Sequence, residues 1–167
     1  QVIFAAPDVD AGLFGEMVPT IRPLAQRLTL YGSEQDWALW VSRQLHGDAP
    51  RAGEAHAVEI AGLDAIDMSE LGRDMLAHNY YSDDSSALVD LATLFLENLD
   101  PVRRCGLERS TAASVWRYRR TACDVRALVA VLTSLKGATA RDPEALGALV
   151  RETLPDPALA ARITPIV

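Results

Sequence analysis

The order of short apolar runs and helical stretches is the feature that most restricts how this chain of 167 residues folds. The first run, QVIFAA at residues 1–6, is continuously apolar, as a strand is when both of its faces are covered. A second run, RLTLY, occupies residues 27–31, and a third strand signal lies at Ala57–Ile66, with VEI and the later AIDM as its apolar pieces. Helical patterns separate these strands. The alternation predicts an α/β fold with a parallel sheet.

Start and stop signals delimit the helices that follow the first two strands. The pattern predicts a helix over Gly12–Gln26, and two prolines within it, Pro19 and Pro23, should break it. Asp36 precedes the second helix, which should stop near Gly47. Helical spacing puts four apolar residues of the second helix on one face: Trp37, Trp40, Val41 and Leu45.

Beyond the third strand, a loop over Leu71–Ser82 is followed by residues that are predicted to be helical. A strongly amphipathic helix starts at Ser85, with these residues on one side: Leu88, Leu91, Leu94, Phe95 and Leu99. Further on, Asp142, Pro143 and Glu144 combine a cap, a proline at the first helical position and an acid in the first turn. The sequence therefore predicts part of an α/β domain over residues 1–120 and a helical extension over residues 121–167.

Charge limits the partners that this chain can have. The formal net charge of -7 argues against general binding to nucleic acid or to acidic membranes. Eleven acids and one base lie between Glu54 and Asp100, whereas six arginines and one acid lie between Val102 and Arg120. Such asymmetry marks an interaction surface, or it means that the basic segment packs near the acidic one.

The remaining sequence signals leave the compartment open. Cys105 and Cys123 form no CxxC pair, so they are reduced core residues or one bridge. No apolar run reaches transmembrane length, and no signal-peptide pattern is present. The chain enters an apolar run at Gln1 without an initiator methionine, and we therefore expect further residues to precede it.

Two polar residues are expected at the carboxyl ends of neighbouring strands, where open parallel sheets collect functional groups. Asp36 lies a few residues after RLTLY, and His78 lies in the loop after the third strand. A histidine in this position can take a proton from a serine hydroxyl. A buried carboxylate beside it fixes the histidine tautomer and stabilises the imidazolium. The pair could therefore supply the acid and the base of nucleophilic catalysis.

Each candidate also has a structural interpretation. Asp36 could be an N-cap of the following helix, or could serve in both roles. His78 could be a histidine of a surface loop. Asp8 and Asp10, after the first strand, are a second pair of acid candidates with a favoured role in the turn. The other two histidines, His46 and His56, lack metal-ligand spacing and are interpreted as surface residues.

Four segments carry a resemblance to a known family: VIFAAPDVD, RLTLYGSEQDWAL, AIDMSELGRDMLAHNYY and the helix after them. They resemble a largely uncharacterised bacterial esterase/lipase-like family of the α/β-hydrolase superfamily, over about Gln1–Arg120. The resemblance implies the C-terminal portion of an α/β-hydrolase fold, that is, its last strands and helices. It also implies that Asp36 is the catalytic acid, that His78 is the catalytic histidine, and that a serine sits at an upstream GxSxG-like elbow.

No GxSxG occurs in the chain, since Ser33 follows Gly32 but position 35 is Gln. The expected function is therefore part of a serine hydrolase for small carboxylic esters, with its nucleophile upstream of Gln1 and no metal or organic cofactor. This chain alone should be inactive. A missing N-terminal portion or another chain should complete the sheet.

The alternative function is a non-catalytic interaction module, because scaffolds can keep a fold and lose its chemistry. An arginine-rich patch would then dock an acidic partner. Its members would be Arg103, Arg104, Arg109, Arg117, Arg119 and Arg120.

Overall fold

The computed structural model describes residues 1–72, 90–91, 93–95, 98–110 and 115–120. In chain order its elements are β1 (Val2–Ala5), α1 (Ala11–Ile21), η1 (Arg22–Leu24), β2 (Leu28–Gly32), α2 (Trp37–Leu45), β3 (Leu63–Asp67), η2 (Ser69–Leu71), η3 (Pro101–Arg103), β4 (Leu107–Arg109) and β5 (Trp116–Tyr118). The predicted helical extension over residues 121–167 lies outside the described residues.

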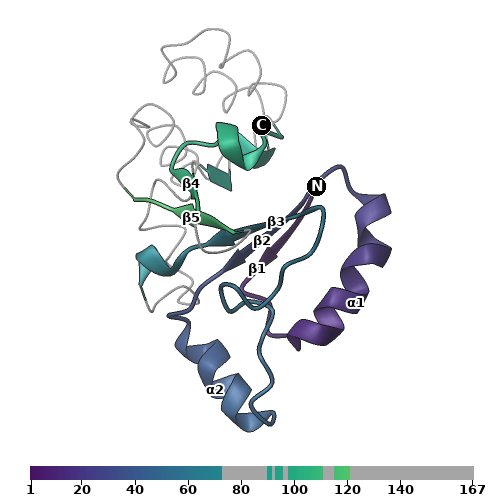
Figure 1. Ribbon diagram of the computed structural model, residues 1–167, viewed down its shortest axis with the longest axis vertical. Helices are drawn as coiled ribbons and strands as arrows, with labels where there is room; N and C mark the ends of the chain where they lie inside the picture. Colours follow the sequence, from purple (N-terminus) through teal and green to yellow (C-terminus); the bar gives the residue numbers. More distant parts are fainter. Residues whose placement is uncertain (73–89, 92, 96–97, 111–114, 121–167) are drawn as a thin grey trace, which may run out of the picture.

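One sheet organises the described part of the chain, with the strand order β1-β2-β3-β5-β4. β1, β2, β3 and β5 run parallel, and β4 pairs antiparallel with β5. The predicted α/β fold with a parallel sheet is therefore confirmed. Figure 1 shows α1 beside the first three strands and α2 beyond the carboxyl end of β2.

β2 is an interior strand, between β1 and β3, and both of its faces are covered. All five of its residues are buried. Leu28 and Leu30 join a core cluster with Phe14 and Val18 of α1. On the opposite face, Tyr31 joins a second cluster, whose other buried members are Ala6, Leu39, Ile66, Met68 and Tyr118. Because both faces are covered, even the polar Thr29 within RLTLY is buried, at 1% exposed.

Two strands lie where the sequence predicted helix. β4 and β5 are three residues each, too short to show a period of two. β5 forms by pairing Ile66 with Trp116 and Asp67 with Arg117, across about fifty residues of sequence. The Arg109 guanidinium also lies over the Trp116 ring, which links the two strands. The all-helical prediction was wrong here, because partners distant in sequence decide these strands.

The predicted boundaries are close for the first two helices and less so for β3. α1 contains Pro19 and ends at Ile21, and a short 3-10 turn with Pro23 follows it. α2 starts after Asp36 and ends before Gly47, as predicted. β3 starts only at Leu63, so the VEI segment lies before the strand.

The apolar face of α2 that the spacing indicated points outward. Trp37, Trp40 and Leu45 are 65%, 57% and 76% exposed, while Leu39 and Ser42 are buried. The apolar spacing therefore marks the outer side of this helix. Asp36 caps the helix from a buried position, and Leu39 on the inner side of the helix packs in the core.

Candidate functional site

Asp36 lies at the carboxyl end of β2 and is 4% exposed. Its backbone is extended, and its Oδ1 accepts hydrogen bonds from the N–H groups of Ala38 at 3.0 Å and Leu39 at 3.1 Å. Oδ2 is buried and has no hydrogen-bond partner among the described residues. One oxygen therefore caps α2, and the other is available to accept a further hydrogen bond.

The surroundings of Asp36 oppose its ionisation. Burial raises the pKa of the Asp36 carboxyl, because the carboxylate loses water. The N–H bonds of Leu39 and Ala38 lower the pKa, and the negative charge of Asp8 raises it. The net direction is upward. A donor or a positive charge at Oδ2 would favour the carboxylate and offset this cost.

A buried arginine joins the turn after β1 to α2. Arg51 is 8% exposed, and its Nε lies 2.7 Å from Oδ1 of Asp8. Its Nε and Nη2 also donate to Oγ of Ser42, at 3.1 and 2.9 Å. The Ser42 hydroxyl donates to Oδ1 of Asp8 at 2.7 Å. We call these three residues the Arg51 cluster.

The segment that carries Arg51 crosses the carboxyl ends of β1 and β2. The Gly53 N–H donates to Pro7 O at 2.9 Å, and its carbonyl accepts from the Ser33 N–H at 2.9 Å. A Cβ at Gly53 would come within 2.6 Å of the Ala6 carbonyl carbon. Because backbone packs directly on backbone, only glycine fits here. The crossing segment holds Arg51 beside the Asp8 turn.

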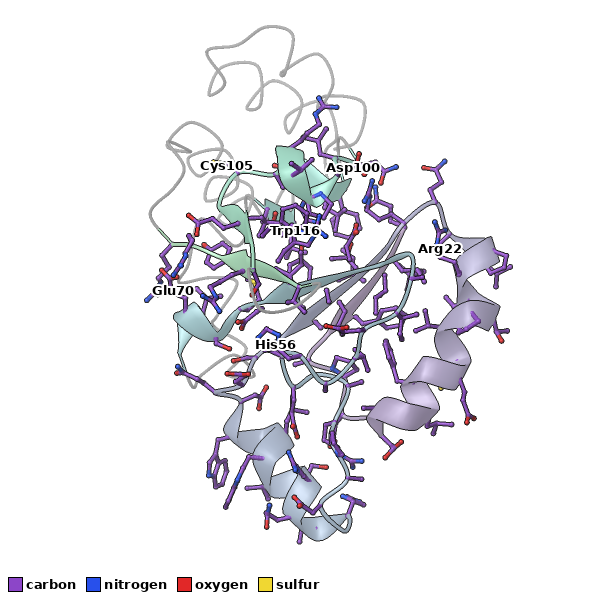
Figure 2. The ribbon with its side chains drawn as sticks, in the orientation of Figure 1. Arg22, His56, Glu70, Asp100, Cys105 and Trp116 are labelled. Atoms are coloured by element: carbon purple, nitrogen blue, oxygen red, sulfur yellow. The ribbon has the colours of Figure 1, made fainter. Side chains whose placement is uncertain are left out.

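A second polar cluster lies at the carboxyl end of β3. Oδ1 of Asp67 accepts from the N–H and the hydroxyl of Ser69, at 2.9 and 2.5 Å. Its Oδ2 lies 3.5 Å from Nε2 of His56 and 3.8 Å from Nε of Arg117. Figure 2 shows the His56 side chain beside the strands. Both oxygens of Asp67 thus have close polar neighbours, whereas Oδ2 of Asp36 has no hydrogen-bond partner in the described part of the chain.

Within the described residues, no histidine is placed to take the hydroxyl proton of the serines of the two clusters and of the β2 turn. The Ser69 hydroxyl donates to Asp67, and Oγ of Ser33 accepts from the Gln35 N–H at 3.1 Å. Oγ of Ser42 lies 3.4 Å from Nδ1 of His46, but that nitrogen lies 2.7 Å from the Ser42 carbonyl, which can only accept. Nδ1 therefore carries a proton and cannot take one from serine.

The predicted site residues are only partly within the described structure. Asp36 lies where an acid was expected, while His78 lies outside the described residues. Asp10 accepts from the Leu13 N–H at 2.9 Å and so caps α1, as its turn role predicted. His46 is exposed, and His56 reaches Asp67. Arg51 was missed, because it stands in a segment whose residues predict only a loop.

The arginine-rich patch of the alternative hypothesis is not one free surface. Arg104 is 2% exposed and forms a buried ion pair with Asp90. Arg119 pairs with Glu70, labelled in Figure 2, and with Glu108. Arg117 lies 3.8 Å from Asp67. The interpretation that the basic segment packs near the acidic one is confirmed for these three arginines.

The described residues hold no group of three or more His, Cys, Asp or Glu side chains arranged to bind a metal ion. None of the helices described is long and apolar enough to cross a membrane. Cys105 is disulfide-bonded, so this cysteine is bridged rather than reduced.

A mostly parallel five-stranded sheet with helices between its strands, and an aspartate after an interior strand, are features of α/β-hydrolase folds. The family model described as "Alpha/beta hydrolase of unknown function (DUF900)" matches residues 1–95, more than half of the chain. The chain belongs to this family. Comparisons with curated proteins and with solved structures gave no match. The match confirms the superfamily that the sequence indicated.

Proposed function

We propose that this chain supplies the acid and the histidine of a serine hydrolase that acts on carboxylic esters. Asp36 is the acid, His78 is the base, and the nucleophilic serine comes from residues outside this chain. The observation that carries the proposal is that the two carboxylate oxygens of Asp36 have different surroundings. Oδ1 is used by the cap of α2, while buried Oδ2 has no partner among the described residues.

A free buried carboxylate oxygen is what a catalytic histidine needs from its acid. In the proposed reaction, Oδ2 of Asp36 accepts the Nδ1–H of His78, which fixes the tautomer with Nε2 unprotonated. The resulting bond also supplies the donor that the buried carboxylate lacks. Asp67, at the end of β3, is less suited to this role because both of its oxygens already have partners.

The chemistry follows in two steps. The serine oxygen attacks the ester carbonyl carbon while Nε2 of His78 takes the serine proton. The C–O bond of the ester then breaks, and the histidine gives its proton to the departing alcohol. Water attacks the acyl-serine in the same manner, and the carboxylic acid leaves. Backbone N–H groups outside this chain would stabilise the oxyanion, and no metal is needed.

The test is labelling of the source protein with a fluorophosphonate probe, followed by intact mass spectrometry. The wild-type protein should gain one probe mass on a serine outside residues 1–167. His78→Ala should slow labelling by about 10³-fold or more, because the base is lost. His46→Ala is the matched control, since His46 is an exposed histidine whose Nδ1 contacts its own helix. A wild-type source protein that takes no label would refute the proposal.

A further inference from the structure

Arg51 stands between the turn after β1 and the helix that Asp36 caps. It contacts Asp8, which follows β1, and Ser42, which lies on the buried side of α2. Asp8 is also the acid whose charge acts on Asp36. The Arg51 guanidinium therefore contacts both α2, which Asp36 caps, and Asp8, whose negative charge opposes ionisation of Asp36.

We propose that Arg51 is a positioning residue for Asp36: it ties α2 to the turn after β1 and neutralises the charge of Asp8, and so keeps Asp36 ionised. For its catalytic meaning, this inference rests on the proposed function. The proposed contacts of Arg51 and its effect on the ionisation of Asp36 do not depend on that function.

The geometry makes Arg51 more than a surface ion pair. Its side chain is 9% exposed, so the arginine end of the pair is shielded from water, whereas the Asp8 side chain is 52% exposed. The guanidinium makes a planar, multi-donor contact with Asp8 and Ser42 together. Ser42 lies fewer than two helical turns after Asp36, so motion of the arginine is passed directly to the capped helix.

The electrostatic direction follows from the neighbours of Asp36. Burial raises the pKa of Asp36, and the charge of Asp8 raises it further. Arg51 supplies a positive charge 2.7 Å from that Asp8 oxygen, which offsets the repulsion. Without Arg51, Asp8 would act on Asp36 uncompensated, and Asp36 would become protonated at higher pH.

Several other charged or titratable groups lie on the elements around Asp36. They are Asp10 in the turn after β1, Glu34 before α2, Arg43 and His46 on α2 and its cap, and Asp48, Glu54 and His56 in the connection to β3. Arg43 is the informative one, because it is an arginine on the same helix as Ser42. Its ion pairs within the described structure are with Asp48 at 2.7 Å and with Glu54 at 3.2 Å.

The experiment follows the Asp36 carboxyl directly, by ¹³C NMR titration of the source protein labelled at aspartate carboxyl carbons. The Asp36 signal is assigned by its loss in Asp36→Asn. The titration midpoint should be highest in Arg51→Met and lowest in Asp8→Asn. It should lie near the wild-type value in the double variant, because removal of Asp8 cancels the effect of removing Arg51.

Two controls separate the charge effect from simple loss of structure. Arg43→Met removes an arginine of α2 that pairs with Asp48 and Glu54, and it should leave the midpoint of Asp36 unchanged. Arg51→Lys keeps the charge and should stay close to wild type. If Arg51→Met does not fold, Arg51→Gln removes the charge with a smaller change of shape, and the inference requires a raised midpoint there as well.

The outcomes are distinct from those of the labelling test. An Arg51→Met midpoint equal to wild type, or a double variant that is not restored, overturns the role of Arg51. If the source protein takes no fluorophosphonate but shows the predicted order of midpoints, the role of Arg51 stands and only the hydrolase proposal is refuted.

Discussion

The turns after β1 and β2 use the same local chemistry in two different environments. Each follows a parallel strand, and each ends in an aspartate whose Oδ1 caps a helix, Asp10 for α1 and Asp36 for α2. Asp10 is only partly buried, beyond the edge strand. Asp36 is 4% exposed after an interior strand, and its buried Oδ2 has no hydrogen-bond partner among the described residues. The cap motif is common to both turns, and burial alone makes one of them a candidate acid.

The strand before Asp36, β2, is also anchored by a buried network of side chains. Tyr31 of β2 donates to Oδ2 of Asp90 at 2.7 Å, and Nε of Arg104 donates to Oδ1 of Asp90 at 2.8 Å. Both charged side chains are fully buried. Burial would lower the pKa of Arg104, but the bonds and charge of Asp90 raise it. β2 is thereby tied to chain segments about sixty residues further on.

The largest expected effect separates the two aspartates by function. Asn caps a helix as well as Asp does, so neither Asp10→Asn nor Asp36→Asn should unfold its helix. Asp36→Asn should reduce ester hydrolysis by the source protein by about 10³- to 10⁴-fold, because the amide favours the wrong histidine tautomer. Asp10→Asn should retain wild-type rates. Equal rates in the two variants, measured as kcat/KM, would remove the distinction between the turns.

The second prediction concerns the anchor of β2. Arg104→Met leaves Asp90 charged and buried without its partner, which should lower the free energy of unfolding by about 3–5 kcal/mol. Arg119→Met is the control, since it breaks exposed pairs with Glu70 and Glu108 and should leave the urea midpoint unchanged. Similar midpoints for the two variants would mean that the ion pair does not stabilise β2.

Removal of each aspartate cap should have a smaller effect on the free energy of unfolding, and the effects at the two turns should be closer in size. Asp10→Ala deprives the Leu13 N–H of its acceptor, and the loss should destabilise the fold by about 1 kcal/mol. Asp36→Ala loses two such bonds but also removes a buried carboxylate that costs free energy. Its net cost, from chemical denaturation at pH 7, should be no larger than that of Asp10→Ala. A much larger cost would show that Asp36 mainly stabilises α2.

The smallest effect is the pH dependence of stability from Asp36. Because burial raises the pKa of Asp36 in the folded state, its protonated form favours folding. This contribution is fully present below the ordinary aspartate value of 3.8 and is lost as pH rises through the raised pKa. The difference in unfolding free energy between wild type and Asp36→Asn should therefore fall over that range. A difference that rises with pH would contradict the direction of the shift.

Local sequence signals predicted much of the half of the sheet that lies nearest the N-terminus. The continuous apolar run at residues 1–6 predicted β1, RLTLY predicted β2, and Asp36 and Gly47 bracketed α2 correctly. These signals succeed because a strand covered on both faces, or a helix with its cap, is decided by residues close in sequence. The position of Asp36 after a strand therefore follows from the order of residues alone.

The sequence by itself determined the α/β alternation, the helix caps and the family to which the chain belongs. Only the tertiary structure decided which side of α2 faces inward, that β4 and β5 are strands, and that Arg51 reaches Asp8 and Ser42. These features depend on contacts between segments distant in the chain. The burial of Asp36 is of this second kind, because it comes from neighbouring segments and not from the cap motif.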